Sequence, residues 1–181
     1  MTETQRLYYE DVYIREFQAQ VLACQAAGKG YAILLDRSAF YPEGGGQPSD
    51  QGVLDSVKVT EVHEKDGELL HYTDAPLEPG TQVTGRINWQ RRFDLMQQHS
   101  GEHMVSGLVH QAYGYDNVGF HMGSDVITVD FNGILTEAQI RKIEQQVNQK
   151  SGRMLQLRFS IRTKMHWKHW ITEARRSLTD R

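Results

Sequence analysis

The chain has 181 residues, of which 39% are hydrophobic and 24% are charged. No apolar run approaches the ~18 to 20 residues of a membrane-spanning helix, so the sequence predicts a soluble globular protein with no membrane partner. Its 20 basic and 23 acidic residues give a formal charge of −3, which argues against a wholly basic nucleic-acid binder. With one cysteine, Cys24, and no secretion-signal pattern at its start, the chain is expected in the cytoplasm.

Short strands separated by glycine-rich or polar turns are predicted over residues 1–89. The predicted strands are Phe17–Cys24, Tyr31–Leu35, Val57–Val62, Leu69–Tyr72 and Val83–Trp89. In the last of these, apolar and polar residues alternate, which is typical of a sheet with one face in water. Several strands of this length are expected to close into a small barrel or a curled sheet.

A glycine-rich loop follows the second predicted strand. The three glycines Gly44–Gly46 stand between Pro42 and Pro48, and they allow positive φ angles and a close approach of backbone amides to a ligand or another backbone. No Gly-Lys-Ser/Thr follows, which excludes a nucleotide P-loop. The neighbouring Phe40 and Tyr41 indicate an ordered loop that presents backbone donors, and the alternative is a plain tight loop.

A long helix is predicted from Gln90 to about Ala112, with Gly114 as its stop. Within it His99 and His103 lie four residues apart, so both imidazoles project from one face, about 6 Å apart at Cβ, and could hold one metal ion. The alternative is a pair of histidines that are merely solvated or hydrogen-bonded. His110 lies two turns further on and is expected to be structural.

The same residues also spell H-x-x-E-H, the pattern of inverzincin peptidases, in which Glu102 would activate a zinc-bound water. Such a site needs a third protein ligand, for which Glu137, Glu144 or Glu173 could be nominated. A five-residue pattern has low specificity, and the chain is small for a peptidase. We keep this function as a minor alternative.

The C-terminal third alternates strands and helices. A strand is predicted at Val126–Phe131, a helix that begins at a capping box formed by Thr136 and Gln139, and a strand at Leu155–Ile161. A last helix is predicted from the spacing of its apolar residues, Trp167, Trp170, Ile171, Ala174 and Leu178. Its tryptophans and basic residues suit an RNA surface, and the alternative is packing of the tryptophans in the core. The basic residues concerned are Arg162, Lys164, Lys168, Arg175 and Arg176.

The expected fold class is therefore α+β. A small β-barrel-like N-terminal domain with the glycine-rich loop is predicted over 1–89, and an α+β domain over 90–181. No flexible linker joins the two, so we expect them to pack together, with a ligand in the cleft between them.

Two of these motifs together resemble the alanyl-tRNA editing proteins, the free-standing relatives of the editing domain of alanyl-tRNA synthetase. They are the loop Phe40–Pro48 and the segment Gln97–His103. Val118–His121 and Val129–Phe131 resemble the region that follows the metal-binding helix of that family. The resemblance runs from about residue 17 to residue 159. It implies a zinc-dependent hydrolase that removes serine, and less often glycine, from mischarged tRNA-Ala, and it makes 90–181 the editing domain.

By this resemblance His99 and His103 are two of the zinc ligands, and the family takes the other two from a later Cys-x3-His motif. This sequence has no such motif, so the editing domain is expected to be truncated at its C-terminus or to have lost half of its metal site. His166 and His169 could be proposed as substitutes, although they would lie on different sides of the last predicted helix. Glu102 replaces a threonine linked to substrate recognition in the synthetase, so that role is not carried over.

Discrimination requires a group whose hydrogen bond only the serine hydroxyl satisfies. The candidate substrate-binding groups are Gln47, Gln98 and the amides of Gly44, Gly45 and Gly46. Zinc would either activate a water or hold the substrate, and the sequence leaves both open. The alternative from another class is a non-catalytic tRNA-binding module that has lost the metal, which the missing Cys-x3-His motif favours.

Overall fold

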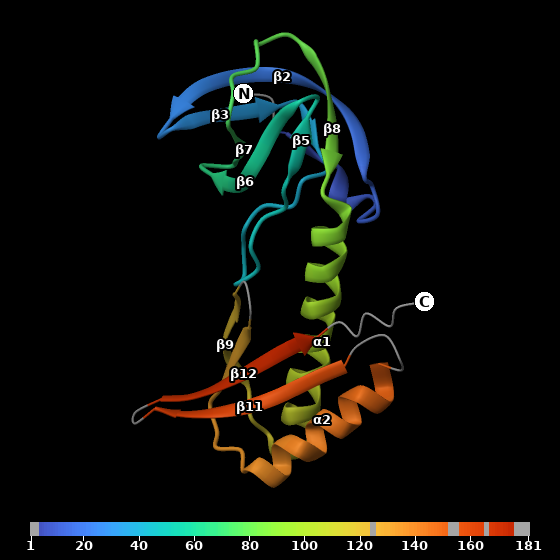
Figure 1. The fold of residues 1–181 in the computed structure, drawn as a ribbon, viewed down its shortest axis with the longest axis vertical. Coiled ribbons are helices and arrows are strands. Elements are labelled where there is room, and N and C mark those ends of the chain that lie inside the picture. The colour runs from blue at the N-terminus through green and yellow to red at the C-terminus, as the bar shows by residue number, and fades with distance from the viewer. Residues whose placement is uncertain (1–3, 124–125, 152–155, 165–166, 176–181) are drawn as a thin grey trace. The chain divides into compact units, whose positions relative to one another are not determined.

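The computed structural model describes residues 4–123, 126–151, 156–164 and 167–175 (Figure 1). It divides into two compact units, and each unit is built from two separate stretches of the chain. The first comprises Met1–Gly44 and Pro48–Asp94, and the second comprises Gly45–Gln47 and Leu95–Arg181. The division falls within the long helix α1, Trp89–Tyr113. No helix in the described ranges is both long and apolar enough to cross a membrane.

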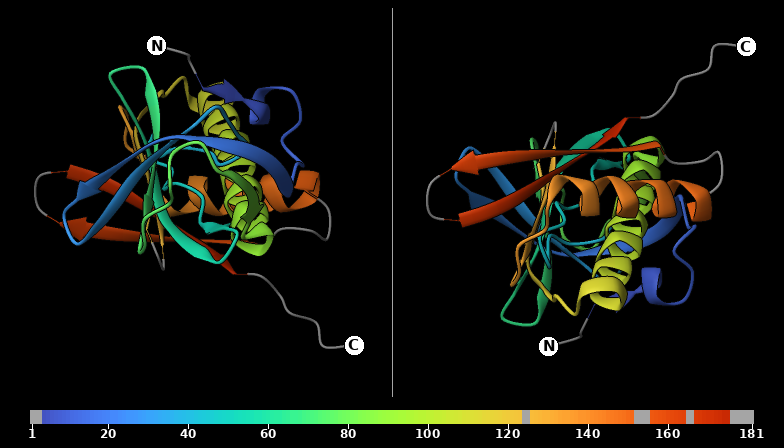
Figure 2. Two further views of the ribbon diagram at one scale, coloured as in Figure 1. Left: turned by 90° about the horizontal axis from the view of Figure 1, so that it is seen from above. Right: turned by 90° about the horizontal axis from the view of Figure 1, so that it is seen from below.

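Six strands of the first unit close into a barrel in the order β2-β3-β7-β6-β5-β8, with antiparallel neighbours (Figures 1 and 2). The elements of this unit are β1 (Gln5–Arg6), η1 (Leu7–Tyr9), β2 (Glu16–Ala27), β3 (Gly30–Leu35), β4 (Arg37–Ser38), β5 (Gly52–Leu54), β6 (Val57–Lys65), β7 (Glu68–Thr73) and β8 (Gln82–Ile87). Alternation explains the strands: in β8, Val83 and Ile87 are buried whereas Arg86 is exposed. Trp89, predicted to end this strand, instead begins α1, since the strand stops at Ile87.

A fully buried histidine lies in the core of the barrel unit. His71 of β7 is within hydrogen-bonding distance of Ser38 Oγ through Nε2 (2.7 Å) and of the Ile33 carbonyl oxygen through Nδ1 (3.1 Å). The carbonyl oxygen can only accept, so Nδ1 carries the proton and Nε2 accepts from the serine hydroxyl. Burial lowers the pKa of His71 to about 4. The hydrogen bond to the Ile33 carbonyl oxygen has the opposite, smaller effect and raises the pKa.

This histidine is expected to make the barrel unit less stable in acid. The folded state keeps His71 neutral, whereas in the unfolded chain it takes up a proton near pH 6.5. Its contribution is therefore fully present above about pH 6.5 and is lost as the pH falls toward about 4, by roughly 3 kcal/mol in all. Urea denaturation of the wild type and of His71→Gln across this range gives the difference in pH dependence. The exposed His110→Gln variant is the control, and equal slopes for wild type and His71→Gln would contradict the prediction.

A buried ion pair joins the start of α1 to the end of the glycine-rich loop within the first unit. Arg92 Nε lies 2.9 and 2.8 Å from the two carboxylate oxygens of Asp50, and both side chains are almost wholly buried. The guanidinium also donates to the carbonyl oxygens of Ala39 and Val12, at 2.7 and 2.9 Å. Asp50 in turn accepts from the Tyr41 amide at 2.7 Å. This network therefore fixes the two ends of the loop to each other.

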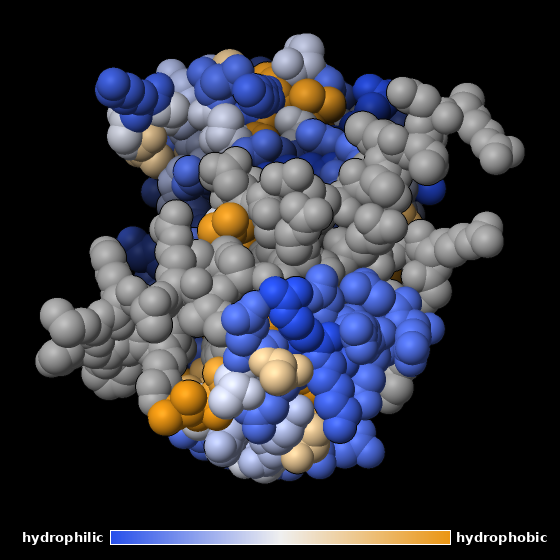
Figure 3. Space-filling view, turned by 60° about the horizontal axis from the view of Figure 1, so that its bottom comes forward, coloured by the Kyte–Doolittle hydropathy of each residue, from blue (hydrophilic) through white to orange (hydrophobic). Residues whose placement is uncertain are grey.

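The second unit is a four-stranded antiparallel sheet in the order β11-β12-β10-β9, with two helices. Its elements after α1 are β9 (Asn117–Met122), β10 (Ile127–Phe131), α2 (Glu137–Ser151), β11 (Gln156–Lys164) and β12 (Trp167–Arg175). Both helices share one hydrophobic core with β9 and β10, to which α2 contributes Ile140, Ile143 and Val147. The predicted capping box is confirmed, since Thr136 N donates to Gln139 Oε1 at 2.7 Å and Gln139 N to Thr136 Oγ1 at 3.4 Å. The outward side of α2 is hydrophilic (Figure 3).

The helix predicted for the C-terminal residues is wrong. The described part of this segment forms β12, where Trp170 pairs with Val129 of β10 and Trp167 pairs with Lys164 of β11. Leu178, the last residue of the predicted helix pattern, lies outside the described residues. Tryptophan, isoleucine and threonine favour strands, and partner strands on both sides satisfy the backbone of β12. The helical spacing of a few apolar residues is the weaker influence here.

Candidate metal and substrate site

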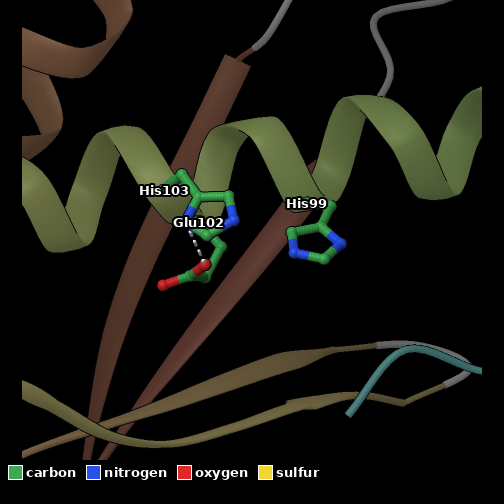
Figure 4. A group of neighbouring side chains, drawn as sticks. All are labelled: His99, Glu102 and His103. Carbon is green, nitrogen blue, oxygen red and sulfur yellow. Dashed lines mark ion pairs between the residues drawn. The ribbon is translucent and has the colours of Figure 1, made fainter. Parts of the chain in front are cut away.

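Helix α1 brings the two predicted histidines together on successive turns. The imidazole rings of His99 and His103 stack with their centroids 4.8 Å apart and their planes at 23°. His99 is half-buried and also packs on the ring of Phe120 in β9, at 5.5 Å between centroids. The side chain of His103 is 72% exposed. Figure 4 shows both rings and Glu102 projecting from the same side of α1.

The tip of the glycine-rich loop belongs to the same unit as this pair. Gly45 and Gly46 have φ angles of +58° and +82°, as the sequence predicted for the glycine run. The Gly46 carbonyl oxygen accepts from the Met122 amide at 2.8 Å, so the tip is bonded to β9. A Cβ at Gly46 would lie 2.1 Å from the carbonyl oxygen of Phe120, which excludes any larger residue there. The glycines thus allow a close backbone contact with β9.

Gln47 follows these glycines and reaches His99. Its Oε1 atom lies 2.6 Å from His99 Nδ1, across 52 positions of the sequence. Both residues were predicted site residues, with Gln47 expected to bind the substrate, and nothing in their spacing indicated that they meet. The structure therefore gives Gln47 a partner in the histidine pair itself.

Glu102 lies beneath the histidines and is held in place. Its side chain is only 4% exposed, and Oε1 accepts from Asn117 Nδ2 at 2.7 Å and from the hydroxyl of Ser106. The second carboxylate oxygen lies 3.4 Å from His103 Nδ1. Asn117 was not recognised from the sequence, because an isolated asparagine at the start of a strand carries no motif. A carboxylate beside Nδ1 favours the form of His103 that carries its proton there.

The electrostatics around His99 favour its neutral imidazole. Burial lowers the pKa of His99, the nearby His103 lowers it further, and the charge of Glu102 acts in the opposite direction. A histidine must be neutral to bind a metal through a ring nitrogen. At neutral pH His99 is therefore in the protonation state that metal binding requires.

The donor set fits a zinc ion. One ligand atom from each of His99, Glu102 and His103 can be chosen so that all lie within 4.8 Å of one another, and this is the cluster that the described part of the chain offers. Two nitrogen ligands of one tetrahedral zinc lie roughly 3.3 Å apart, so small side-chain rotations bring the imidazoles into range. Glu137 and Glu144, nominated as third ligands for a peptidase, are not in the cluster.

Three other residues considered from the sequence lie outside the cluster of His99, Glu102 and His103. Gln98 is half-buried in α1, one helical turn before Glu102. His110 is exposed near the end of α1, and its Nδ1 lies 2.9 Å from Asp116 Oδ1. Cys24 is half-buried in β2 of the barrel unit and lies outside the cluster. His110 and Cys24 therefore add nothing to the donor set described.

The basic residues nominated for tRNA lie on two strands. Arg162 and Lys164 belong to β11, and Lys168 pairs with Thr163 between them, so these three positions meet at one end of the hairpin. Arg175 is the last residue of β12, at the other end. The three positions are therefore near one end of the hairpin, but alternation along the strands puts position 168 on the opposite face of the sheet from positions 162 and 164, and position 175 lies at the other end.

The proposed substitute ligands and one basic residue are only partly within the described structure. His169 lies in β12, opposite Asp130 of β10 and Arg162 of β11. Glu173, the third carboxylate nominated for a peptidase, also lies in β12. His166 and Arg176 lie outside the described residues.

Comparison with known proteins gives the class. The family model described as "tRNA synthetases class II (A)" matches residues 2–91. Alanyl-tRNA editing protein Aarsd1 of Mus musculus is 37% identical over 159 residues, which cover 80% of this chain and 38% of that protein. Alanyl-tRNA editing protein AlaX-L of Pyrococcus horikoshii is 34% identical over 152 residues, covering 80% and 37%. An alanine–tRNA ligase of Ignicoccus hospitalis is 38% identical over 154 residues, covering 80% and 16%.

The first half of the chain is thus related to the class II (A) tRNA synthetases. Over about 80% of its length the chain is similar to alanyl-tRNA editing proteins, and this similarity confirms the resemblance that the two motifs predicted. It spans less than two fifths of the length of the editing proteins it matches.

Proposed function

We propose that this chain hydrolyses serine, and less often glycine, from mischarged tRNA-Ala, or forms the larger part of an enzyme that does so. The observation that carries the proposal is the stacked pair of His99 and His103, with Gln47 of the glycine-rich loop bonded to His99, in a chain related to alanyl-tRNA editing proteins.

His99 and His103 are the residues that we assign to a zinc ion. When bound, zinc supplies a Lewis acid that polarises a carbonyl group or lowers the pKa of a water molecule. Two imidazole ligands leave coordination positions for other protein atoms, for water or for the substrate. Gln98 and the amides of Gly44, Gly45 and Gly46 are proposed to bind the aminoacyl group of the substrate. Gln47 is proposed to lie next to that group.

The reaction is the hydrolysis of an activated ester. A water oxygen adds to the carbonyl carbon, the bond between that carbon and the ribose oxygen breaks, and the ribose oxygen takes up a proton. The products are the free amino acid and tRNA-Ala with both ribose hydroxyls restored. The site must therefore position a water molecule and stabilise an oxyanion, for which the backbone donors of the glycine-rich loop are suited.

The tRNA is proposed to bind to the basic residues of the C-terminal hairpin. These are Arg162, Lys164, Lys168 and Arg175, together with Arg176. Contacts of this kind neutralise phosphates, so the affinity should fall steeply with salt. A cytoplasmic location, where aminoacyl-tRNAs are used, is part of the same proposal.

The proposal is tested by deacylation of Ser-tRNA-Ala by the 181-residue chain supplemented with zinc. We expect serine to be released while Ala-tRNA-Ala, the matched control, is hydrolysed at least about 100-fold more slowly, since a site that hydrogen-bonds a hydroxyl rejects a substrate without one. Equal hydrolysis of both would contradict the substrate assignment. No turnover with either, in the presence of bound zinc, would contradict the activity.

The second candidate function is a tRNA-binding module without catalysis. One observation favours it: among the described residues the metal cluster contains no cysteine, and Cys24 belongs to the other unit. Binding of tRNA-Ala without zinc uptake or turnover would establish this function. The peptidase alternative is less favoured than these two, because Glu102 is buried and one of its oxygens accepts hydrogen bonds from Ser106 and Asn117.

A further inference from the structure

The contact between Gln47 and His99 defines the chemistry of the imidazole. A carboxamide oxygen can only accept a hydrogen bond, so at 2.6 Å from Gln47 Oε1 the Nδ1 atom of His99 must carry a proton. A neutral imidazole has one ring proton, and Nε2 is therefore left with its lone pair. This is the nitrogen that can bind a metal ion or accept a proton.

We infer that Gln47 is a positioning residue that holds His99 with its proton on Nδ1 and its lone pair on Nε2. The inference rests on the proposed function only where it connects this form to the metal, because the hydrogen bond itself is a property of the chain alone. Metal-bound histidines in proteins almost always have such an acceptor behind the ring, and its removal weakens metal binding.

The loop is built to hold this acceptor in one place. Gln47 is only 9% exposed, so an oxygen without a donor there would carry a desolvation cost. The preceding residue, Gly46, is fixed to β9 by the bond from Met122, and its close approach to Phe120 leaves no room to shift inward. Phe120 also packs on the His99 ring. One segment of β9 therefore positions both partners of the hydrogen bond.

No other described contact gives the His99 ring a preferred proton position. The rings of Phe120 and His103 pack beside it, and neither packing contact distinguishes Nδ1 from Nε2. Without Gln47, His99 is expected to return to the Nε2–H form, which free imidazole side chains favour in water. The glutamine therefore selects the form, and the packing selects only the orientation of the ring plane.

The test is the proton position in the metal-free chain, read by long-range 1H–15N NMR of histidine labelled with 15N in the ring, at a pH where His99 is neutral. We expect wild type to show protonated Nδ1 and unprotonated Nε2. Gln47→Leu removes the acceptor and should give mainly Nε2–H, whereas Gln47→Glu retains an acceptor and should keep Nδ1–H. Gln51→Leu is the matched control, because Gln51 bonds the Thr60 carbonyl oxygen in the barrel unit and should leave His99 unchanged.

A second readout is zinc affinity, measured with the metal alone against a chelator. Gln47→Leu should bind zinc about 10- to 100-fold more weakly than wild type, and Gln47→Glu should recover most of the loss. Nε2–H in the wild type, or an unchanged Nδ1–H in Gln47→Leu, would overturn the inference whatever the activity. If the NMR result is as expected but the wild type binds zinc and hydrolyses no Ser-tRNA-Ala, the proposed function fails while the role of Gln47 stands.

Discussion

Replacing His99 by alanine is expected to lower the hydrolysis of Ser-tRNA-Ala more than about 100-fold and to reduce the zinc bound by the chain. The physical reason is that the imidazole is the partly buried member of the pair, and it is held by Gln47 on one side and by Phe120 on the other. Loss of an outer partner of a metal ligand alone costs ~10- to 100-fold, so loss of the ligand should cost more. Deacylation rates and metal content per chain, measured on the same samples, check both effects.

The matched control is His110→Ala in the same helix. His110 is exposed, pairs with Asp116 and is not part of the metal cluster. Both the rate and the zinc content should equal those of the wild type. A His99→Ala variant that keeps its zinc and its rate would remove His99 from the metal site and, with it, the proposed mechanism.

Replacing Arg92 by methionine is expected to cost about 3–5 kcal/mol of the free energy of unfolding of the barrel unit. The substitution removes every donor from the buried Asp50 carboxylate except the Tyr41 amide, and it leaves the carbonyl oxygens of Ala39 and Val12 without the guanidinium. An unpaired buried carboxylate is among the most destabilising changes that one substitution can make. Urea denaturation followed by circular dichroism measures the loss.

Two further variants make this result specific. Arg86→Met breaks an ion pair with Glu16 in the same unit, but both side chains are more than half exposed, so the cost should be below about 1 kcal/mol. The double variant Arg92→Met with Asp50→Leu removes both charges and should be less destabilised than the sum of the single variants. A cost for Arg92→Met no larger than that for Arg86→Met would show that the buried pair contributes little.

Much of the fold follows from local patterns in the sequence. Alternation located the long barrel strands to within a few residues, and the apolar spacing from Gln90 onward predicted α1, which extends one residue beyond the prediction at each end. The capping box at Thr136 placed the start of α2. The last helix was predicted wrongly because β12 depends on pairing with β10, more than 35 positions earlier, and a local pattern cannot register such a partner.

The histidines of the candidate site could be predicted from the sequence, but the residues that contact them could not. The spacing of His99 and His103 places them on one face of a helix wherever that helix packs. The partners of these histidines are set by tertiary structure instead: Gln47 arrives from another part of the chain, and Asn117 comes from the strand that follows α1. Sequence spacing carries no information about either contact.

The second unit includes Gly45–Gln47, which is flanked in the sequence by residues of the first unit. No single cleavage of the chain can therefore separate the two units. A fragment beginning at Leu95 would contain both histidines, the sheet and α2, yet it would lack the only described acceptor for His99 Nδ1. Measurements on such a fragment would therefore report a histidine pair in a different chemical form. The same order applies during synthesis, where Gln47 emerges from the ribosome before His99 and must wait for α1 and β9 before the pair can be assembled.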